Sequence, residues 1–273
     1  MRTGTRMTGL VVGAFLVLAG SAHAQWTETD SGRCEDRGRR DVERHCRTLT
    51  GAFDPPRRID VDGGANGGVA VEGWTRDLVE VRAKIWADAR DPDRARALAD
   101  EVRVRMTDGR LVASGPDTGR GEQWGVSWDV MVPEEMDLDI ETMNGGIAVA
   151  GVSGRIDFRA VNGGVHLTGV GGDVTGRTTN GGVHVELDGR RWDGQGLDVE
   201  TTNGGVTLVL PSDYSARLET GTVNGGIDID FPVTVQGRVG RRLEATLGEG
   251  GPPVRVVTTN GGVRIGRAGN AIR

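Results

Sequence analysis

The chain has 273 residues, a formal net charge of −6 and 46 glycines, and only 4% of its residues are aromatic. An acidic chain lacks the basic field that phosphate binding requires, so nucleic acid is excluded as its main partner. Large side chains are too scarce to fill a conventional globular core. The glycines instead recur at fixed intervals, which indicates a repeat protein.

The first 24 residues have the pattern of an export signal. Arg2 and Arg6 provide a positive start, an apolar run covers residues 10–19, and residues 21–24 fit the small-x-small pattern that signal peptidase reads. The apolar run is shorter than the roughly 20 residues that cross a bilayer. We therefore expect cleavage before Gln25, no transmembrane segment in the mature chain, and a periplasmic or secreted location. The alternative is an uncleaved N-terminal anchor.

Residues 25–58 form a polar segment that contains the two cysteines, Cys34 and Cys46. An even number of cysteines in an exported chain favours a disulfide between them. On a straight helix these positions would lie about 18 Å apart, which is too far for a disulfide, so the pairing requires the segment to fold back. The alternative is a metal site built from Cys34, His45 and Cys46, although this spacing fits no common zinc pattern.

Residues 59–136 are expected to form a small capping part built of strands and one short helix. Apolar and polar residues alternate over 59–74 and 78–86, which predicts strands. The sequence Asp-Pro-Asp before residues 94–100 predicts a helix start, because proline and aspartate favour the first helical turn. A hairpin is predicted over residues 102–114, which turn at an Asp-Gly pair.

One hexapeptide organises the rest of the chain. It reads Asn-Gly-Gly, then Val or Ile, then a variable residue, then an aliphatic one. From the second copy onward, the intervals between copies are 18, 18, 23, 21 and 36 residues. So many copies in one register indicate a repeat architecture. The copies begin at Asn66, Asn144, Asn162, Asn180, Asn203, Asn224 and Asn260.

Each copy predicts a turn followed by a short strand. Asn-Gly is a favoured turn pair, because both residues tolerate positive φ. After the turn the side chains alternate, so Val165 and Leu167 are expected to point inward and His166 outward. A second glycine turn lies halfway round the unit, at residues 151–154 and 169–172. A unit of this length with two turns suits one coil of a solenoid.

The predicted fold is therefore all-β: a single-stranded, β-helix-like β-solenoid of stacked coils of about 18–23 residues, behind a small strand and helix cap. It would cover residues 137–268 and leave 269–273 as a tail. The asparagines would stack in a column, each amide bonding to the coils above and below. An antiparallel sandwich with glycine hairpins is the alternative. Stacking in chain order predicts a buried column of Ile147, Val165, Val183, Val206, Ile227 and Val263.

Two rows of outward residues are candidates for ligand binding. His166 and His184 occupy the same outward slot in adjacent coils, with Glu186 two residues further on, and two histidines with a carboxylate can bind zinc or copper. The alternative is a solvated face, since other residue types fill the same slot in other coils. A second row holds Glu141, Arg159, Arg177 and Glu200, in which adjacent guanidinium groups suit a carboxylate or sulfate of an anionic glycan, or form a surface ion-pair ladder.

A third row contains Asp139, Asp157 and Asp198, with Thr175 interrupting it. Polysaccharide-cleaving enzymes need such acids in a groove, but these three are predicted on an open strand face. The sequence has no Gly-x-Ser-x-Gly elbow, HExxH pair or phosphate-binding loop. We therefore expect no catalytic residues and no cofactor.

The chain resembles the bacterial "putative adhesin" family of exported repeat domains over roughly residues 46–267. The resemblance rests on the stretch from Gly68 to Trp74, on the Asn-Gly-Gly copies, and on the ending GEGGPPVRVVTTNGGVRI. It implies a β-solenoid and carries over no catalytic residues. The N-terminal polar segment departs from the family pattern.

These observations favour an exported, non-catalytic, adhesin-like structural or binding protein of the cell envelope. Its expected partners are an envelope protein, a glycan, or further copies of the same chain. The alternatives are a carbohydrate-active enzyme on a β-helix and a metal-binding envelope protein.

Overall fold

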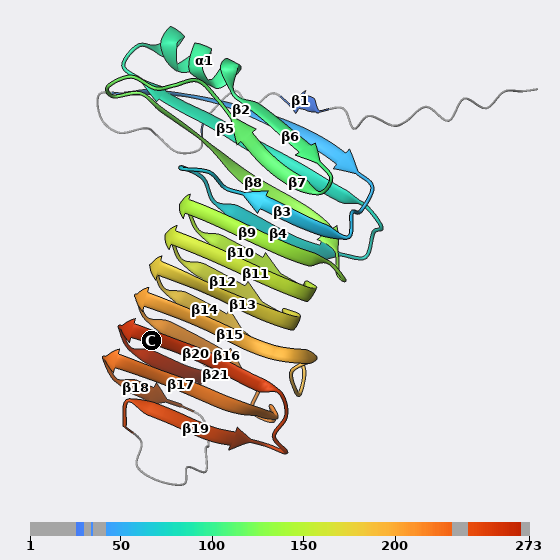
Figure 1. The fold of residues 1–273 in the computed structure, drawn as a ribbon, viewed down its shortest axis with the longest axis vertical. Helices are drawn as coiled ribbons and strands as arrows, with labels where there is room; N and C mark the ends of the chain where they lie inside the picture. Colours follow the sequence, from blue (N-terminus) through green and yellow to red (C-terminus); the bar gives the residue numbers. More distant parts are fainter. Residues whose placement is uncertain (1–25, 30–33, 35–41, 231–239, 269–273) are drawn as a thin grey trace, which may run out of the picture.

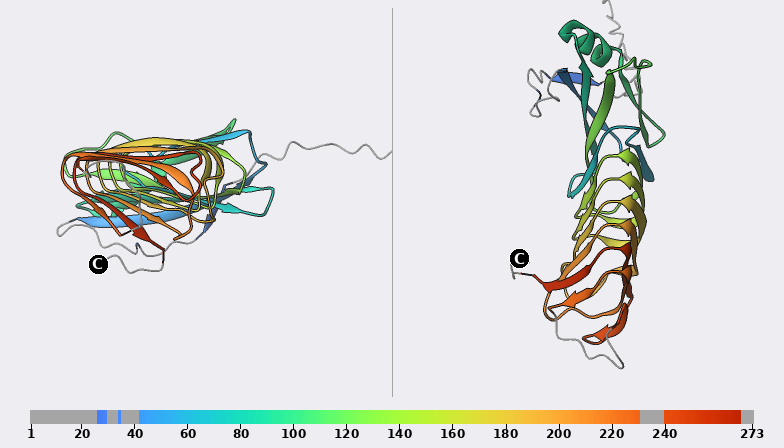
Figure 2. Two further views of the ribbon diagram at one scale, coloured as in Figure 1. Left: turned by 90° about the horizontal axis from the view of Figure 1, so that it is seen from below. Right: turned by 90° about the vertical axis from the view of Figure 1, so that its left-hand side faces the viewer.

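The computed structural model describes residues 26–29, 34, 42–230 and 240–268. The signal peptide predicted for residues 1–24 and the tail 269–273 lie outside the described residues. The described chain forms sheet A, with eleven strands, and sheet B, with ten. The two sheets face each other and form the two broad sides of a stack of flattened coils, as the views along and across the stack show (Figures 1 and 2). The prediction of an all-β solenoid is confirmed.

Four middle coils follow one another in chain order (Figure 1). Each coil contributes one strand to sheet B, passes through the Asn-Gly-Gly turn, and contributes a shorter strand to sheet A. Neighbouring strands are parallel and in register, so that equivalent asparagines align. The four pairs are β9 (Asp137–Asn144) with β10 (Ile147–Ala150), β11 (Ser153–Asn162) with β12 (Val165–Thr168), β13 (Gly171–Asn180) with β14 (Val183–Glu186), and β15 (Gly194–Asn203) with β16 (Val206–Leu210).

At each end of the stack, coils follow out of chain order. At the N-terminal end, the later pair β7–β8 lies outside the earlier pair β3–β4. At the C-terminal end, the later pair β20–β21 lies inside β17–β18. The strands are β3 (Arg58–Asp62), β4 (Val69–Trp74), β7 (Arg110–Ser114), β8 (Gln123–Pro133), β17 (Ala216–Asn224), β18 (Ile227–Ile229), β20 (Pro253–Asn260) and β21 (Val263–Arg267).

The chain-order stacking predicted for the last two repeats is therefore wrong. Val263 pairs with Val206 on one side and with Ile227 on the other, which reverses the expected end of the column. The physical reason is that the Asn224 and Asn260 copies carry the same bonding groups. Either copy can sit beside the Asn203 coil, and the long connection between them lets the later copy insert.

The same stacking continues into the part of the chain for which the sequence predicts a cap. β4 pairs with β10, and β3 pairs with β9, so the first repeat copy is one coil of the solenoid. Beyond β8, sheet A continues through three antiparallel strands, and sheet B ends at β6 after β7. These strands are β5 (Val79–Ala89), β2 (Glu43–Phe53), β1 (Thr27–Thr29) and β6 (Arg103–Thr107).

A single helix in the described chain, α1 (Pro92–Glu101), closes the N-terminal end (Figure 1). Asp91 caps it by accepting a hydrogen bond from the backbone N–H of Arg94, which satisfies one of the unpaired donors at a helix start. Its buried side, which includes Leu98, packs on β2 and β5. At the other end, the antiparallel strand β19 (Arg242–Leu247) covers β17. No described helix is long and apolar enough to span a membrane.

The core lies between the two sheets and consists of aligned aliphatic rows. Val165 and Leu167 are buried and His166 is exposed, so the predicted alternation is confirmed. In one buried row a large residue lies beside a small one. Phe158 pairs with Gly176 in the next coil, and its ring occupies the space that a side chain at Gly176 would fill. This match of volumes keeps the narrow interior filled without voids.

The Asn-Gly-Gly turn is required for a reason other than the one expected. None of the repeat asparagines has a positive φ, and among the first glycines of the copies only Gly261 does. The first glycine is needed because neighbouring coils approach closely there: a Cβ on Gly163 would lie 1.9 Å from the carbonyl oxygen of Gly145. The expectation that the turn needs these residues for a positive φ is therefore wrong. The first glycine is needed because a side chain there would collide with the neighbouring coil.

Side chains at the turn connect each coil to the next. Each repeat asparagine from the second copy onward donates from Nδ2 to Oδ1 of the asparagine in the neighbouring coil, at 2.7–3.4 Å. Two residues earlier, a threonine donates to the carbonyl of the first glycine of that coil, as Thr178 does to Gly163 at 2.8 Å. The other threonines with this bond are Thr142, Thr201, Thr222 and Thr258.

Candidate binding surfaces

Alternation along the strands gives the stack two outer faces of different chemistry. The outward positions of β3, β9, β11, β13, β15, β17 and β20 in sheet B, which we call the charged face, are rich in Asp, Glu and Arg. The corresponding positions of β10, β12, β14 and β16 in sheet A hold mainly Ala, Thr and His. Both faces are shaped by the same register, because successive coils align residue by residue.

On the charged face, the three acids predicted to share a row do so. Asp157 pairs with Asp139 in register, and Thr175 separates Asp157 from Asp198. The structure adds Asp60 of β3 beside Asp139, a fourth member that the sequence reading missed. Asp60 was missed because one extra residue separates it from its repeat asparagine, compared with the other acids of the row. The alternation of apolar and polar residues over 58–62 was the signal that could have placed it on the outer face.

Arginines neutralise this acidic row. Arg58 contacts both Asp60 and Asp139, the latter at 2.9 Å, and Arg155 lies 3.0 Å from Asp157. Partial burial raises the pKa of the Asp139 carboxyl, and the charge of Arg58 opposes that shift. The acids therefore take part in ion pairs on an open face rather than lining a groove.

The predicted arginine row is also in register, and its two arginines differ. Arg159 lies 2.9 Å from Glu141, while Glu200 is bound by Arg255 at 2.7 Å. Arg177 stands exposed between Arg159 and Glu200 and forms no ion pair with any residue that the structure describes. The row therefore offers one unpaired guanidinium group to a partner.

On sheet A, the His166 and His184 rings stack, with centroids 4.4 Å apart and planes inclined by 34°. Burial, followed by the neighbouring His166, lowers the pKa of His184, and Glu186 opposes this shift. Within the described ranges, no three His, Cys, Asp or Glu side chains are grouped so that they could hold a metal ion.

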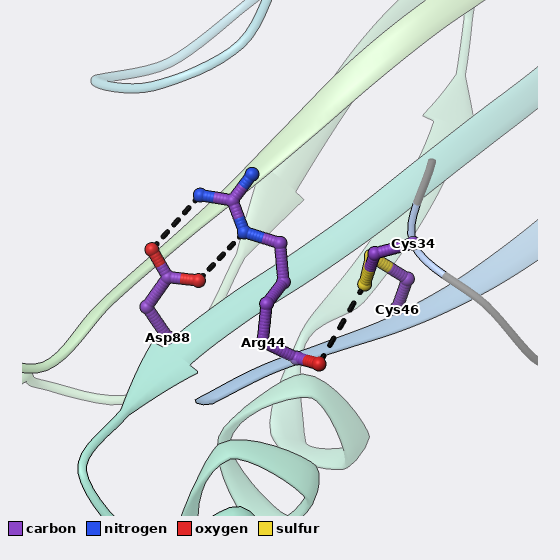
Figure 3. The surroundings of a disulfide bond; sticks show 4 residues. All are labelled: Cys34, Arg44, Cys46 and Asp88. Atoms are coloured by element: carbon purple, nitrogen blue, oxygen red, sulfur yellow. Dashed lines mark hydrogen bonds and ion pairs between the residues drawn. A yellow bond between two sulfur atoms is a disulfide. The ribbon is translucent and has the colours of Figure 1, made fainter. Parts of the chain in front are cut away.

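The two cysteines form a disulfide, with Cα atoms 5.5 Å apart (Figure 3). The same figure shows Arg44, between them in the sequence, in a two-bond ion pair with Asp88 at 2.7 and 2.9 Å. Asp88 is only 1% exposed and also accepts from Gln123. This buried acid was missed by the sequence reading, because nothing local to Asp88 indicates burial. The disulfide and the ion pair together fix β2 in the cap.

The model of the Toastrack DUF4097 family matches residues 126–266, which is just over half of the chain. The chain belongs to the Toastrack DUF4097 family. The matched region includes all middle coils and the reordered C-terminal coils. The resemblance noted in the sequence is thereby confirmed. No curated protein sequence matches the chain.

Two solved structures are similar to this Toastrack protein at low identity. A "putative cell adhesion protein" from Clostridium sporogenes is 12% identical, with 82% of this chain and 100% of that chain covered and a TM-score of 0.43. A "putative adhesin" from Bacteroides fragilis is 13% identical, with 81% and 96% covered and a TM-score of 0.39. Nothing about function follows from such distant similarity.

Proposed function

We propose that this protein is an exported, non-catalytic binding scaffold of the cell envelope, with an adhesin-like role. The observation that carries the proposal is the in-register stack. It holds outward side chains on a grid about 4.8 Å apart along the stack, on a body closed by caps at both ends. A rigid grid loses little conformational entropy on binding, which favours recognition of extended partners.

The disulfide between Cys34 and Cys46 supports a location outside the cytoplasm, because structural disulfides persist in oxidising compartments. The signal-like N-terminus points the same way. N-terminal sequencing of the exported protein tests this part directly. We expect the first residue to be Gln25; retention of residues 1–24 would favour the membrane-anchor alternative.

The charged face is the part of the scaffold best suited to a charged partner. Arg177 is exposed without an ion-pair partner in the described chain, whereas Arg159 is engaged by Glu141. An incoming carboxylate or sulfate can therefore bind Arg177 without breaking an existing pair. This difference between the two arginines makes Arg177→Ala the sharper test of the surface, with Arg159→Ala as the matched variant.

The test combines binding and product analysis. The purified exported protein is mixed with washed envelope fragments, sedimented, and the supernatant is assayed for released sugars. We expect the protein to co-sediment and no sugar to appear. Release of sugars that stops in an Asp139→Asn/Asp157→Asn variant would identify an enzyme instead. Absence of co-sedimentation with every envelope fraction would also count against the scaffold.

A further inference from the structure

One edge of the solenoid carries no charge along its whole length. It consists of four residues in each repeat copy: the residue before the asparagine, the asparagine and the two glycines. We call this strip the neutral edge. All of its positions are uncharged in a chain in which 26% of residues are charged. The strip comprises residues 65–68, 143–146, 161–164, 179–182, 202–205, 223–226 and 259–262.

The neutral edge gathers exposed apolar side chains beside hydrogen-bonding groups. The large hydrophobic residues that are exposed in the described structure, Met143, Val161 and Val223, all directly precede a repeat asparagine. Exposed threonines such as Thr179 fill the same position in other coils. In the copies from Asn162 onward, the amide uses one N–H in the ladder and keeps a second donor free, whereas the amide of Asn144 also donates to the carbonyl of Ala65. Such a strip suits a neutral partner with both C–H faces and hydroxyl groups.

A cavity of about 180 Å3 lies at the N-terminal end of this strip. It is lined only by uncharged residues, which include Ala65, Asn66, Thr118 and Trp124. The indole of Trp124 is fixed, because its Nε1–H donates to the carbonyl of Pro116 at 2.9 Å. Drug-sized ligands need roughly 300–1,000 Å3, so this cavity fits one small ring.

A second hollow, of about 420 Å3, lies at the other end of the strip over Gly205, Gly226 and Gly262, with Asp228 and Arg264 also in its lining. The glycines leave room there, because no side chain rises above the backbone. The asparagine ladder therefore runs from an aromatic cavity to an open hollow. Both ends of the neutral edge can receive parts of one extended molecule.

We infer that the neutral edge binds a linear glycan of neutral, β-1,4-linked hexose units, with its terminal sugar in the Trp124 cavity. Sugar rings offer C–H faces to an indole and hydroxyl groups to amides. The length of one such unit is close to the spacing between coils, about 4.8 Å. Each sugar can therefore lie opposite one asparagine, with alternate sugars presenting the same face to the strip. The inference rests on the proposed scaffold function and names its ligand.

Calorimetry with chitohexaose and cellohexaose tests the inference on the purified exported protein. At least one of them is expected to bind, and salt should change the affinity little, because the sugars and the strip itself are uncharged. Thr118→Glu places a charge in the cavity and Thr179→Glu places one on the strip; each should weaken binding about tenfold or more. Thr246→Glu is the matched control, since Thr246 is exposed on β19 outside the strip. Trp124→Ala should abolish binding.

The outcomes separate this inference from the proposed function. Failure of both sugars to bind, while the protein still co-sediments with envelope fragments, would overturn the inference alone. Binding that Thr246→Glu weakens as much as Thr118→Glu does would also overturn it, as would binding that salt or Arg177→Ala removes. Cleavage of either sugar would overturn the scaffold function itself. Circular dichroism confirms that each variant is folded, and the three glutamate variants alter exposed threonines only.

Discussion

The neutral edge and the charged face are built on the same coils but differ in how much they vary. The edge repeats Asn-Gly-Gly in seven copies, and its amides and glycines bond to or closely approach the neighbouring coil. The charged face changes residue type from coil to coil on an unchanged backbone. Repetition within this chain therefore marks positions that hold the coils together, and variation marks positions that stacking does not constrain.

The largest expected effect is at the first glycine of a middle copy. Gly163→Ala places a Cβ 1.9 Å from the carbonyl oxygen of Gly145, so the coils must move apart. We expect the free energy of unfolding to fall by about 3 kcal/mol, measured by urea denaturation. Gly164→Ala is the control, because its Cβ would lie 3.4 Å from the nearest carbonyl. Equal effects at both positions would show that the turn, and not the contact between coils, requires glycine.

A smaller effect is expected at the threonine that the sequence reading did not single out as a link between coils. Thr178→Val keeps the shape of the side chain but leaves the Gly163 carbonyl without its hydroxyl donor. The loss should be about 1–2 kcal/mol. The adjacent Thr179→Val is exposed and should change stability by less than about 0.5 kcal/mol. If the two variants unfold at the same urea concentration, the buried bond contributes nothing.

The repeat made the fold class, the strand register and the outward rows predictable from the sequence. Alternation around each copy placed Val165 inward and His166 outward, because the side-chain period of a strand is two. The order of the coils was not predictable: the copies at Asn224 and Asn260 are interchangeable in their local bonds. Asp88 and Trp124 were missed for a related reason, since their surroundings come from segments distant in the sequence.

A pH-dependent effect on stability is expected at His184, on the outer face of sheet A. The lowered pKa of His184 means that the folded protein takes up this proton less readily than the unfolded chain. His184 should therefore not change the free energy of unfolding above about pH 6.5. Below that value its contribution should lower the free energy of unfolding as the pH drops. Urea denaturation at pH 7.5 and 5.0 measures the loss, which His184→Gln should reduce. His166→Gln should raise the pKa of His184 in an NMR titration; an unchanged pKa would mean that burial alone lowers it.

The smallest effect on stability is expected on the charged face. Glu141→Gln removes the partner of Arg159, in a pair whose side chains are 58% and 59% exposed. Exposed pairs contribute about 0–1 kcal/mol, so the free energy of unfolding should change by less than about 0.5 kcal/mol and even less in high salt. The change frees a second guanidinium group beside Arg177, so that two cations stand adjacent on the row.

Binding of envelope fragments carrying carboxylate or sulfate groups should then strengthen in Glu141→Gln while stability stays the same. Co-sedimentation at low salt measures this, with Arg177→Ala as the opposing variant. A variant that loses stability without changing binding would instead assign this row to the structure. The charged face would then resemble the neutral edge in holding coils together.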